Sequence, residues 1–181
     1  MYEKSNSKSD NKLKKNVVLT GMMGVGKSTV GKLLAKKLSF NFVDIDALIE
    51  KKEGSPIKVI FGRHGENYFR KLEQELVLQE IHKRNSVISL GGGAFLSRSI
   101  RSAVREFSIS FWLDVNLDIL TKRLQNNVNR PLLGKKNISE TINKIYLERK
   151  ETYNEASFKI NCSFLKPGEI VKEILKFYEN S

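Results

Sequence analysis

Hydrophobic residues recur along the chain in short runs that are separated by polar or glycine-containing segments. Five runs are rich in β-branched and aromatic residues and predict strands: 16–20 (NVVLT), 42–44 (FVD), 86–90 (SVISL), 108–114 (SISFWLD) and 158–161 (FKIN). Between them, apolar residues recur with the helical period on three predicted faces: Val30, Leu33, Leu34 and Leu38; Phe69, Leu72 and Leu76; and Ile170, Val171, Ile174 and Tyr178. This alternation predicts an α/β fold of three layers, α/β/α, in which helices cover both faces of a five-stranded parallel sheet.

The length of the chain favours one domain. A chain of 181 residues can bury one core but not two. Residues 1–15 (MYEKSNSKSDNKLKK) are polar and basic, and we expect them to form a disordered head before a single domain over 16–181. No run approaches the roughly 20 apolar residues of a membrane span, and the head lacks the apolar stretch of a secretory signal. We therefore expect a cytoplasmic protein with no membrane partner.

The charge and the cysteine content narrow the partners further. A net charge of +12 makes nucleic acid a candidate partner, because clustered lysine and arginine bind phosphate backbones. However, the lysines are scattered and few aromatic residues lie among them, which favours a solvated surface that serves small anionic ligands. We therefore expect no nucleic-acid partner. Cys162 is the only cysteine and cannot form an internal disulfide, and neither His64 nor His82 has a partner at metal-ligand spacing.

The segment after the first predicted strand, residues 21–28 (GMMGVGKS), has the spacing of a phosphate-binding loop: glycine, four residues, glycine, lysine, serine. Glycine lets backbone N–H groups surround phosphate oxygens, and a helix predicted from Thr29 adds the free N–H groups of its first turn. We expect Lys27 to contact the outer phosphates and the Ser28 hydroxyl to bind magnesium. A nucleoside triphosphate should thus be bound by Gly24, Val25, Gly26, Lys27, Ser28 and Thr29. The alternative is a glycine-rich turn with only a structural role.

Two carboxylates follow the second predicted strand in FVDID. By the strand period of two, Asp44 and Asp46 should share one side of an extended strand. Asp44 could then hold magnesium through its waters, and Asp46 could accept the hydrogen of an attacking hydroxyl. The alternative for Asp46 is the N-cap of the helix ALIEKKE. Asp114, after SISFWL, is a second magnesium candidate, which we place behind Asp44 because it has no companion carboxylate and can be a capping or turn residue.

Glycines and an arginine mark a second group of candidates. Gly91, Gly92 and Gly93 follow a predicted strand, where backbone without side chains can approach a ligand closely. A triple glycine can also be a flexible turn. Arg70 lies on the helix after GENY with Glu73 three residues on, and the alternative to a binding role for it is an exposed helical ion pair.

Arg149 shares a helical stripe with apolar and aromatic residues, so its guanidinium should face inward: the stripe comprises Ile142, Ile145, Tyr146, Arg149 and Tyr153. An inward guanidinium needs an anion, which is either an internal carboxylate or the carboxylate of a ligand. Before this helix lies QNNVNRPLLGKKNIS, which we interpret as a mobile lid over about residues 126–136. The lid carries Arg130, which could neutralise charge on a phosphoryl group during transfer.

The motifs GMMGVGKSTVGKLLA, FVDIDALIE, GENYFRKLE, SLGGGAF, RPLL and ERKETYNEAS follow one another in the order and spacing of the shikimate kinase family. From about residue 16 to residue 167 the chain resembles this family. The resemblance implies a P-loop kinase of the nucleoside monophosphate kinase-like type with a mobile lid. It also implies transfer of the γ-phosphate of ATP to the 3-hydroxyl of shikimate, a step in the synthesis of chorismate and the aromatic amino acids. We expect ATP and magnesium as cofactors, shikimate as the small-molecule partner, and a monomer.

The resemblance also implies roles for individual residues. Asp46 looks like the residue that binds and activates the shikimate hydroxyl, and Arg70 and Arg149 look like its carboxylate clamp, with Gly91, Gly92 and Gly93 lining the same pocket. Lys27, Ser28 and Asp44 match the phosphate and magnesium positions, Arg130 matches the lid arginine, and Arg123 and Pro167 match contacts on the adenine side. Asp46, Lys27 and Arg130 are the catalytic candidates. The chain departs from the family at Leu90, where a small polar residue is common, and in its unusually basic lid.

Three other functions use some of the same features. A GTPase-type switch needs a guanine-reading Asn-Lys-x-Asp, and the nearest approach, residues 143–146, ends in tyrosine. A basic nucleic-acid-binding module would bind with a steep dependence on salt. Another small-metabolite kinase, such as a gluconate kinase, shares the loop but does not need two arginines directed at one carboxylate.

Overall fold

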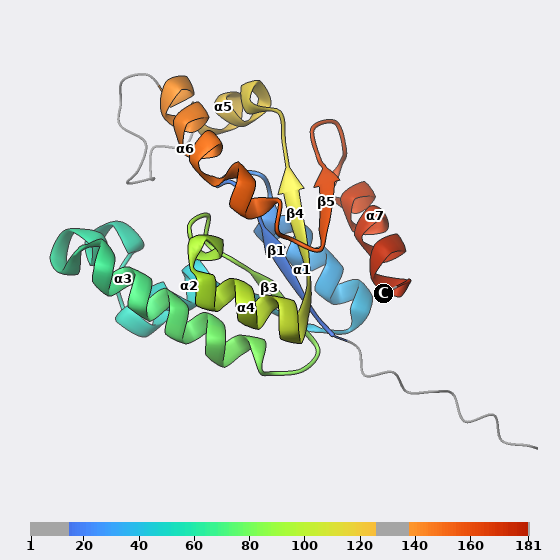
Figure 1. Ribbon diagram of the computed structural model, residues 1–181, viewed down its shortest axis with the longest axis horizontal. Coiled ribbons are helices and arrows are strands. Elements are labelled where there is room, and N and C mark those ends of the chain that lie inside the picture. Colours follow the sequence, from blue (N-terminus) through green and yellow to red (C-terminus); the bar gives the residue numbers. More distant parts are fainter. Residues whose placement is uncertain (1–14, 126–137, 181) are drawn as a thin grey trace, which may run out of the picture.

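The computed structural model describes residues 15–125 and 138–180 (Figure 1). Its strands are β1 (Asn16–Thr20), β2 (Asn41–Asp44), β3 (Ser86–Ser89), β4 (Ser108–Asp114) and β5 (Phe158–Asn161). They form one sheet in the order β2-β3-β1-β4-β5, and every neighbouring pair is parallel. Strand β1 lies at the centre, and its Val17, Val18 and Leu19 are fully buried. The predicted five-stranded parallel sheet is confirmed.

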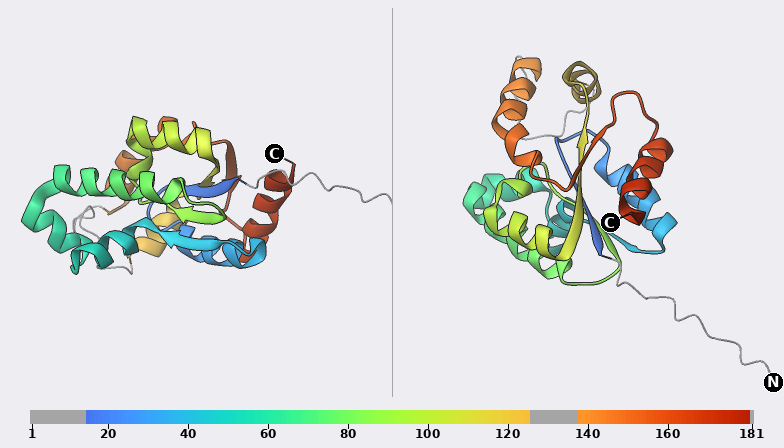
Figure 2. Two further views of the ribbon diagram at one scale, coloured as in Figure 1. Left: turned by 90° about the horizontal axis from the view of Figure 1, so that it is seen from below. Right: turned by 45° about the vertical axis from the view of Figure 1, so that its right-hand side comes forward.

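Helices cover both faces of this sheet. Helices α1 (Lys27–Leu38) and α7 (Pro167–Glu179) lie on one face, and α3 (Ile57–Ile81) and α4 (Arg98–Phe107) lie on the other (Figures 1 and 2). Helix α2 (Ile45–Glu53) packs against α3, and α5 (Leu117–Gln125) packs against α6 (Ile138–Tyr153). A short 3₁₀ turn, η1 (Ala94–Leu96), follows β3. The predicted three layers are therefore present.

The buried faces of the helices match the apolar pattern with one exception. The faces predicted for α3 and α7 are buried, whereas Leu33 of α1 is 42% exposed. At Gly31 a Cβ would lie 2.4 Å from the ring of Phe42, so α1 approaches the sheet closely through this glycine. This close approach turns Val30, Gly31 and Leu34 toward the sheet and leaves Leu33 outside. The prediction that Leu33 lies on the buried face was thus wrong. Hydrophobic periodicity does not show that a helix can pack closely against a sheet through a glycine such as Gly31.

Helix α3 is interrupted at Gly65, whose φ of 78° and ψ of 174° are not helical. Gly54, which ends α2, also has a positive φ, 62°. Between these two glycines a short helical segment begins at Ile57, whose N–H donates to Glu50 Oε1 at 2.9 Å. Glycine is favoured at both positions because side chains disfavour a positive φ. The segment that begins at Ile57 is therefore separated from the rest of α3 by the break at Gly65, and several of its residues line a cavity.

Parts of two predictions fall outside the described residues. Residues 1–14 of the predicted head lie outside the described residues, and so does the whole of the predicted lid at 126–136. Within the described ranges, none of the helices combines the length and the apolar character needed to cross a bilayer.

Candidate active site

The loop between β1 and α1 contains three glycines with positive φ angles, which let the backbone turn tightly. Its glycines Gly21, Gly24 and Gly26 have φ values of 131°, 80° and 102°. A Cβ at Gly24 would lie 2.8 Å from the Leu124 side chain, so glycine is needed there for space as well. Helix α1 begins at Lys27, two residues before the predicted start, because Gly26 already turns the chain into the helix. The free N–H groups of the first turn thus lie directly at the loop.

Three polar side chains gather at this loop. The buried Lys27 ammonium donates to the carbonyl oxygens of Gly21 and Met22, each at 2.9 Å. The Ser28 hydroxyl donates to Asp44 Oδ2 at 2.5 Å. The loop thus combines the Lys27 ammonium with two oxygen groups, the Ser28 hydroxyl and the Asp44 carboxylate, of the kind that Mg²⁺ prefers as ligands. In the described part of the chain no cluster of three or more His, Cys, Asp or Glu residues could hold a metal ion.

Two cavities open at the carboxyl ends of the strands. The smaller, of about 250 Å³, is here called the P-loop cavity, and its lining comprises Met23, Gly24, Gly26, Lys27, Ser28, Thr29, Asp44, Asp46, Ser89, Leu90 and Gly92. The larger, of about 620 Å³, is called the arginine cavity, and its lining comprises Met23, Asp46, Glu50, residues 56–59, Phe61, Phe69, Arg70, Glu73, residues 91–93 and Arg149. Met23, Asp46 and Gly92 line both cavities. Ligands in the two cavities would therefore meet at these residues.

The two aspartates lie on different elements, which corrects the prediction that they share one side of a strand. Strand β2 ends at Asp44, and Asp46 lies in the first turn of α2. Asp44 is the N-cap, and its Oδ1 accepts from the N–H of Ala47 at 3.3 Å. The alternative of an N-cap applies to Asp44 rather than to Asp46. The helix begins early because a capping carboxylate satisfies a free N–H group that an extended strand end would leave unpaired.

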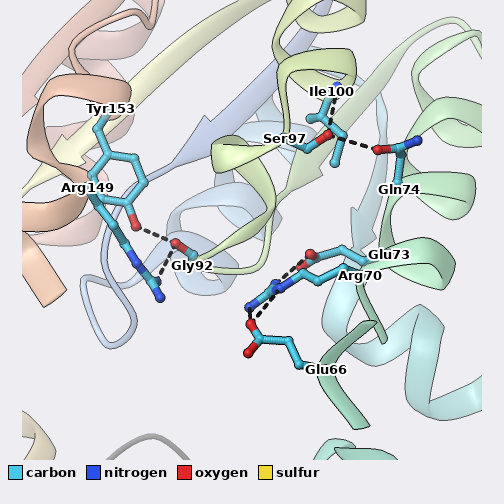
Figure 3. Close-up of polar contacts among 9 residues, drawn as sticks. All are labelled: Glu66, Arg70, Glu73, Gln74, Gly92, Ser97, Ile100, Arg149 and Tyr153. Carbon is cyan, nitrogen blue, oxygen red and sulfur yellow. Dashed lines mark hydrogen bonds and ion pairs between the residues drawn. The ribbon is translucent and has the colours of Figure 1, made fainter. Parts of the chain in front are cut away.

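Arg70 takes part in a network of carboxylates at the arginine cavity (Figure 3). Its Nη1 donates to Glu73 Oε2 at 2.6 Å, and its Nε and Nη2 donate to Glu66 Oε1 at 3.2 Å. Arg70 therefore forms the helical ion pair with Glu73 that the sequence offered as an alternative. This pair is not exposed as expected, because the Glu73 side chain is only 2% exposed. Arg70 also lines the cavity, so the ion pair and a role in ligand binding do not exclude each other.

Glu73 is a site residue that the sequence indicated only as a partner of Arg70. Its Oε1 is buried and has no hydrogen-bond partner among the described residues. Burial raises the pKa of Glu73 above its ordinary value, against the opposing charge of Arg70, and the nearby Asp46 carboxylate raises it further. The available signal was its position between Leu72 and Leu76 on a buried face.

Arg149 faces inward, as the helical stripe predicted. It is 9% exposed, and its Nη1 donates to the carbonyl oxygen of Gly92 at 2.8 Å. Over residues 15–125 and 138–180 no carboxylate lies within ion-pair distance of it, so the alternative of an internal carboxylate finds no support there. The hydroxyl of Tyr153 donates to the same Gly92 oxygen (Figure 3). Tyr153 was predicted on the stripe but without this contact.

The three glycines allow charged side chains to approach the backbone. A Cβ at Gly91 would lie 2.6 Å from Asp46 Oδ1 and 2.7 Å from Glu73 Oε1, and one at Gly93 would lie 2.7 Å from Arg70 Nη2. Real Cβ atoms essentially never lie so close to other heavy atoms. The segment is thus a packed part of the cavity rather than a flexible turn.

The remaining candidates lie apart from both cavities or outside the described residues. Arg123, in the last turn of α5, and Pro167, the first residue of α7, are exposed and line neither cavity. Asp114 lies 2.9 Å from Lys159 in an ion pair between β4 and β5, consistent with its lower place as a magnesium candidate. Arg130 lies outside the described residues. Leu90 is buried and lines the P-loop cavity.

Comparisons with known proteins show the family of this chain. The model of the shikimate kinase family matches residues 23–179. A shikimate kinase from a Sulfurihydrogenibium species is 45% identical over 161 residues, which are 89% of this chain and 96% of the relative. The structure of shikimate kinase from Acinetobacter baumannii in complex with shikimate has a TM-score of 0.88 at 29% identity and covers 92% of this chain and 93% of its own. That of the Aquifex aeolicus shikimate kinase has a TM-score of 0.81 at 36% identity, covering 91% and 96%. The chain therefore belongs to the shikimate kinase family.

Proposed function

We propose that the chain transfers the γ-phosphate of ATP to the 3-hydroxyl of shikimate, in the synthesis of chorismate and the aromatic amino acids. Membership of the family makes the protein an ATP-dependent kinase with shikimate as its acceptor. The observation that carries the assignment of roles is the position of Asp46, which lines both the P-loop cavity and the arginine cavity. A group at this position can contact both the acceptor hydroxyl and the transferred phosphoryl group.

The arginine cavity suits a hydroxylated carboxylic acid. Arg149 and Arg70 both line it, and a guanidinium can bind a carboxylate through two parallel hydrogen bonds. Arg149 uses one N–H on Gly92, which leaves other N–H groups for a ligand carboxylate. The relative from Acinetobacter baumannii was solved in complex with shikimate, which supports this choice of acceptor. We assign the binding of the shikimate carboxylate to Arg70 and Arg149. Residues 91–93 would line the same cavity beside the bound shikimate.

The P-loop cavity suits the phosphates of ATP. We assign them to the backbone of residues 24–29 and to the Lys27 ammonium, which lies at the start of α1. The oxygens of Ser28 and Asp44, 2.5 Å apart, fit a magnesium ion that Ser28 would bind directly and Asp44 through water. Magnesium, when bound, neutralises phosphate charge. We also assign Arg130 to the lid, and Arg123 and Pro167 to the adenine side, on the resemblance to the family alone.

The reaction is a direct in-line displacement without a covalent enzyme intermediate. The 3-hydroxyl oxygen bonds to the γ-phosphorus while the bond from this phosphorus to the β–γ bridging oxygen breaks, and ADP leaves. Asp46 accepts the hydroxyl proton, and Lys27 and Arg130 stabilise the charge on the phosphoryl group. Closure of a lid at about 126–136 would exclude water, which otherwise competes for the phosphoryl group. We also propose that the protein acts as a monomer; light scattering after gel filtration tests this.

Release of ADP by the purified protein tests the function. The assay contains ATP and magnesium, with shikimate, gluconate, quinate or no acceptor. We expect strong stimulation by shikimate alone. No stimulation by shikimate, or equal stimulation by gluconate, would contradict the assigned acceptor while leaving the nucleotide site standing.

A further inference from the structure

Two side chains of α6, four residues apart, converge on one backbone oxygen. Arg149 Nη1 and the Tyr153 hydroxyl both donate to the carbonyl oxygen of Gly92 (Figure 3). Four residues separate neighbouring positions on one helix face, so both side chains reach the same side of the glycine segment. A carbonyl oxygen has two lone pairs, and these two donors occupy both.

Gly92 lies where a change in its backbone would affect both cavities. A Cβ there would lie 3.4 Å from the Met23 backbone nitrogen and 3.5 Å from Arg149 Nη1, so the glycine lies between the P-loop and the guanidinium. It also lines both cavities. The orientation of this one peptide group therefore affects both the direction of Arg149 and the junction between donor and acceptor.

The surroundings of Tyr153 hold its hydroxyl in place. The side chain is fully buried, and its ring packs on Trp112 with 5.9 Å between the ring centroids. Burial raises the pKa of Tyr153, although the Arg149 charge opposes this, so the hydroxyl keeps its proton and acts as a donor at neutral pH. Tyr153 lines neither cavity and has no access to a ligand.

We propose that Tyr153 is a positioning residue for the acceptor carboxylate and acts through Arg149. Its hydroxyl holds one lone pair of the Gly92 oxygen, which limits Arg149 to a single N–H on that carbonyl. The remaining N–H groups of the guanidinium then stay directed at the cavity. Without the hydroxyl, the guanidinium can turn and place a second N–H on the vacated lone pair, and it then meets a carboxylate in the wrong orientation. The proposal rests on the proposed function, because it assumes that Arg149 binds the carboxylate of shikimate.

The test compares Tyr153→Phe with Tyr178→Phe. Both variants remove only a hydroxyl from a buried tyrosine that donates to a backbone carbonyl, but Tyr178 donates to Lys15, which lines neither cavity. We expect Tyr153→Phe to raise KM for shikimate about five- to twentyfold, as for the loss of one oriented hydrogen bond, with KM for ATP within about twofold of the parent. Tyr178→Phe should leave both constants unchanged. Urea unfolding of both variants measures the structural cost of each hydroxyl.

A double variant separates positioning through Arg149 from other effects. If Tyr153 acts through Arg149, Tyr153→Phe raises KM for shikimate no further in an Arg149→Ala background. Multiplied effects in the double variant, equal increases in KM for both substrates, or a shikimate KM unchanged by Tyr153→Phe would each overturn the proposal. An unmodified protein that shikimate does not stimulate would instead overturn the proposed function, so the two failures are distinct.

Discussion

Replacing Gly91 by alanine should test whether the carboxylates at the junction of the cavities must hold their positions. The added Cβ would lie 2.6 Å from Asp46 Oδ1 and 2.7 Å from Glu73 Oε1. To restore ordinary contact at 3.4 Å, Asp46 Oδ1 must move away by about 0.8 Å and Glu73 Oε1 by about 0.7 Å. Glu73 cannot move alone, because it is 2% exposed and bound to Arg70 at 2.6 Å. The substitution should thus displace the proposed base and one clamp arginine together.

A shift of about 1 Å in a reacting group can lower the rate about a hundredfold. We therefore expect Gly91→Ala to lower kcat by about two orders of magnitude and to raise KM for shikimate. Binding of ATP should change little, because Gly91 does not line the P-loop cavity. Coupled ADP release gives kcat and KM, and calorimetry with a non-hydrolysable ATP analogue gives the affinity for nucleotide.

The matched control is Gly168→Ala in α7, where nothing lies within 4 Å of the added Cβ. This variant should keep the kinetic constants of the parent. A Gly91→Ala protein with parental kcat and KM would refute the reasoning, since Asp46 and Glu73 could then move without consequence. An equal loss of nucleotide affinity would point to a wider distortion instead.

Three further predictions follow from the same site. Arg149→Ala should weaken shikimate binding by about 2 to 5 kcal/mol, the usual cost of truncating a buried charge pair, with little change for ATP; equal losses for the two ligands in titration calorimetry would assign the residue a structural role. Asp46→Asn should lower kcat by about 10²- to 10⁴-fold while shikimate still binds, as for the loss of a general base, and single-turnover kinetics with near-parental rates would exclude that role. Glu73→Gln should change how stability depends on pH. Because burial raises the pKa of Glu73, the folded state holds the proton more tightly than the unfolded chain, whose carboxyl has the ordinary value of 4.5. The tighter binding of this proton contributes to the free energy of unfolding. The contribution is fully present below pH 4.5 and is lost as pH rises through the pKa of Glu73 in the folded state. The variant should lack this decline, and parallel urea-melt profiles for the two proteins would contradict the assignment.

The sequence by itself determined the elements that follow from local pattern. The ends of every predicted strand lie within one residue of the observed ends, because β-branched runs and turn residues act over a few positions. The P-loop was recognisable for the same reason, since its glycines, lysine and serine are neighbours in the chain. The inward direction of Arg149 also followed from the helical stripe, which requires only the period of the helix.

Only the tertiary structure decided which groups meet. The cap at Asp44 ended β2 and placed Asp46 on a helix, and Gly31 turned Leu33 outward, because capping and close packing prevail over simple periodicity. The convergence of Arg149 and Tyr153 on Gly92 joins positions 57 and 61 residues apart. No local pattern encodes such a contact. It exists because parallel strands bring the segments that follow their carboxyl ends to one end of the sheet, where residues far apart in the sequence come into contact.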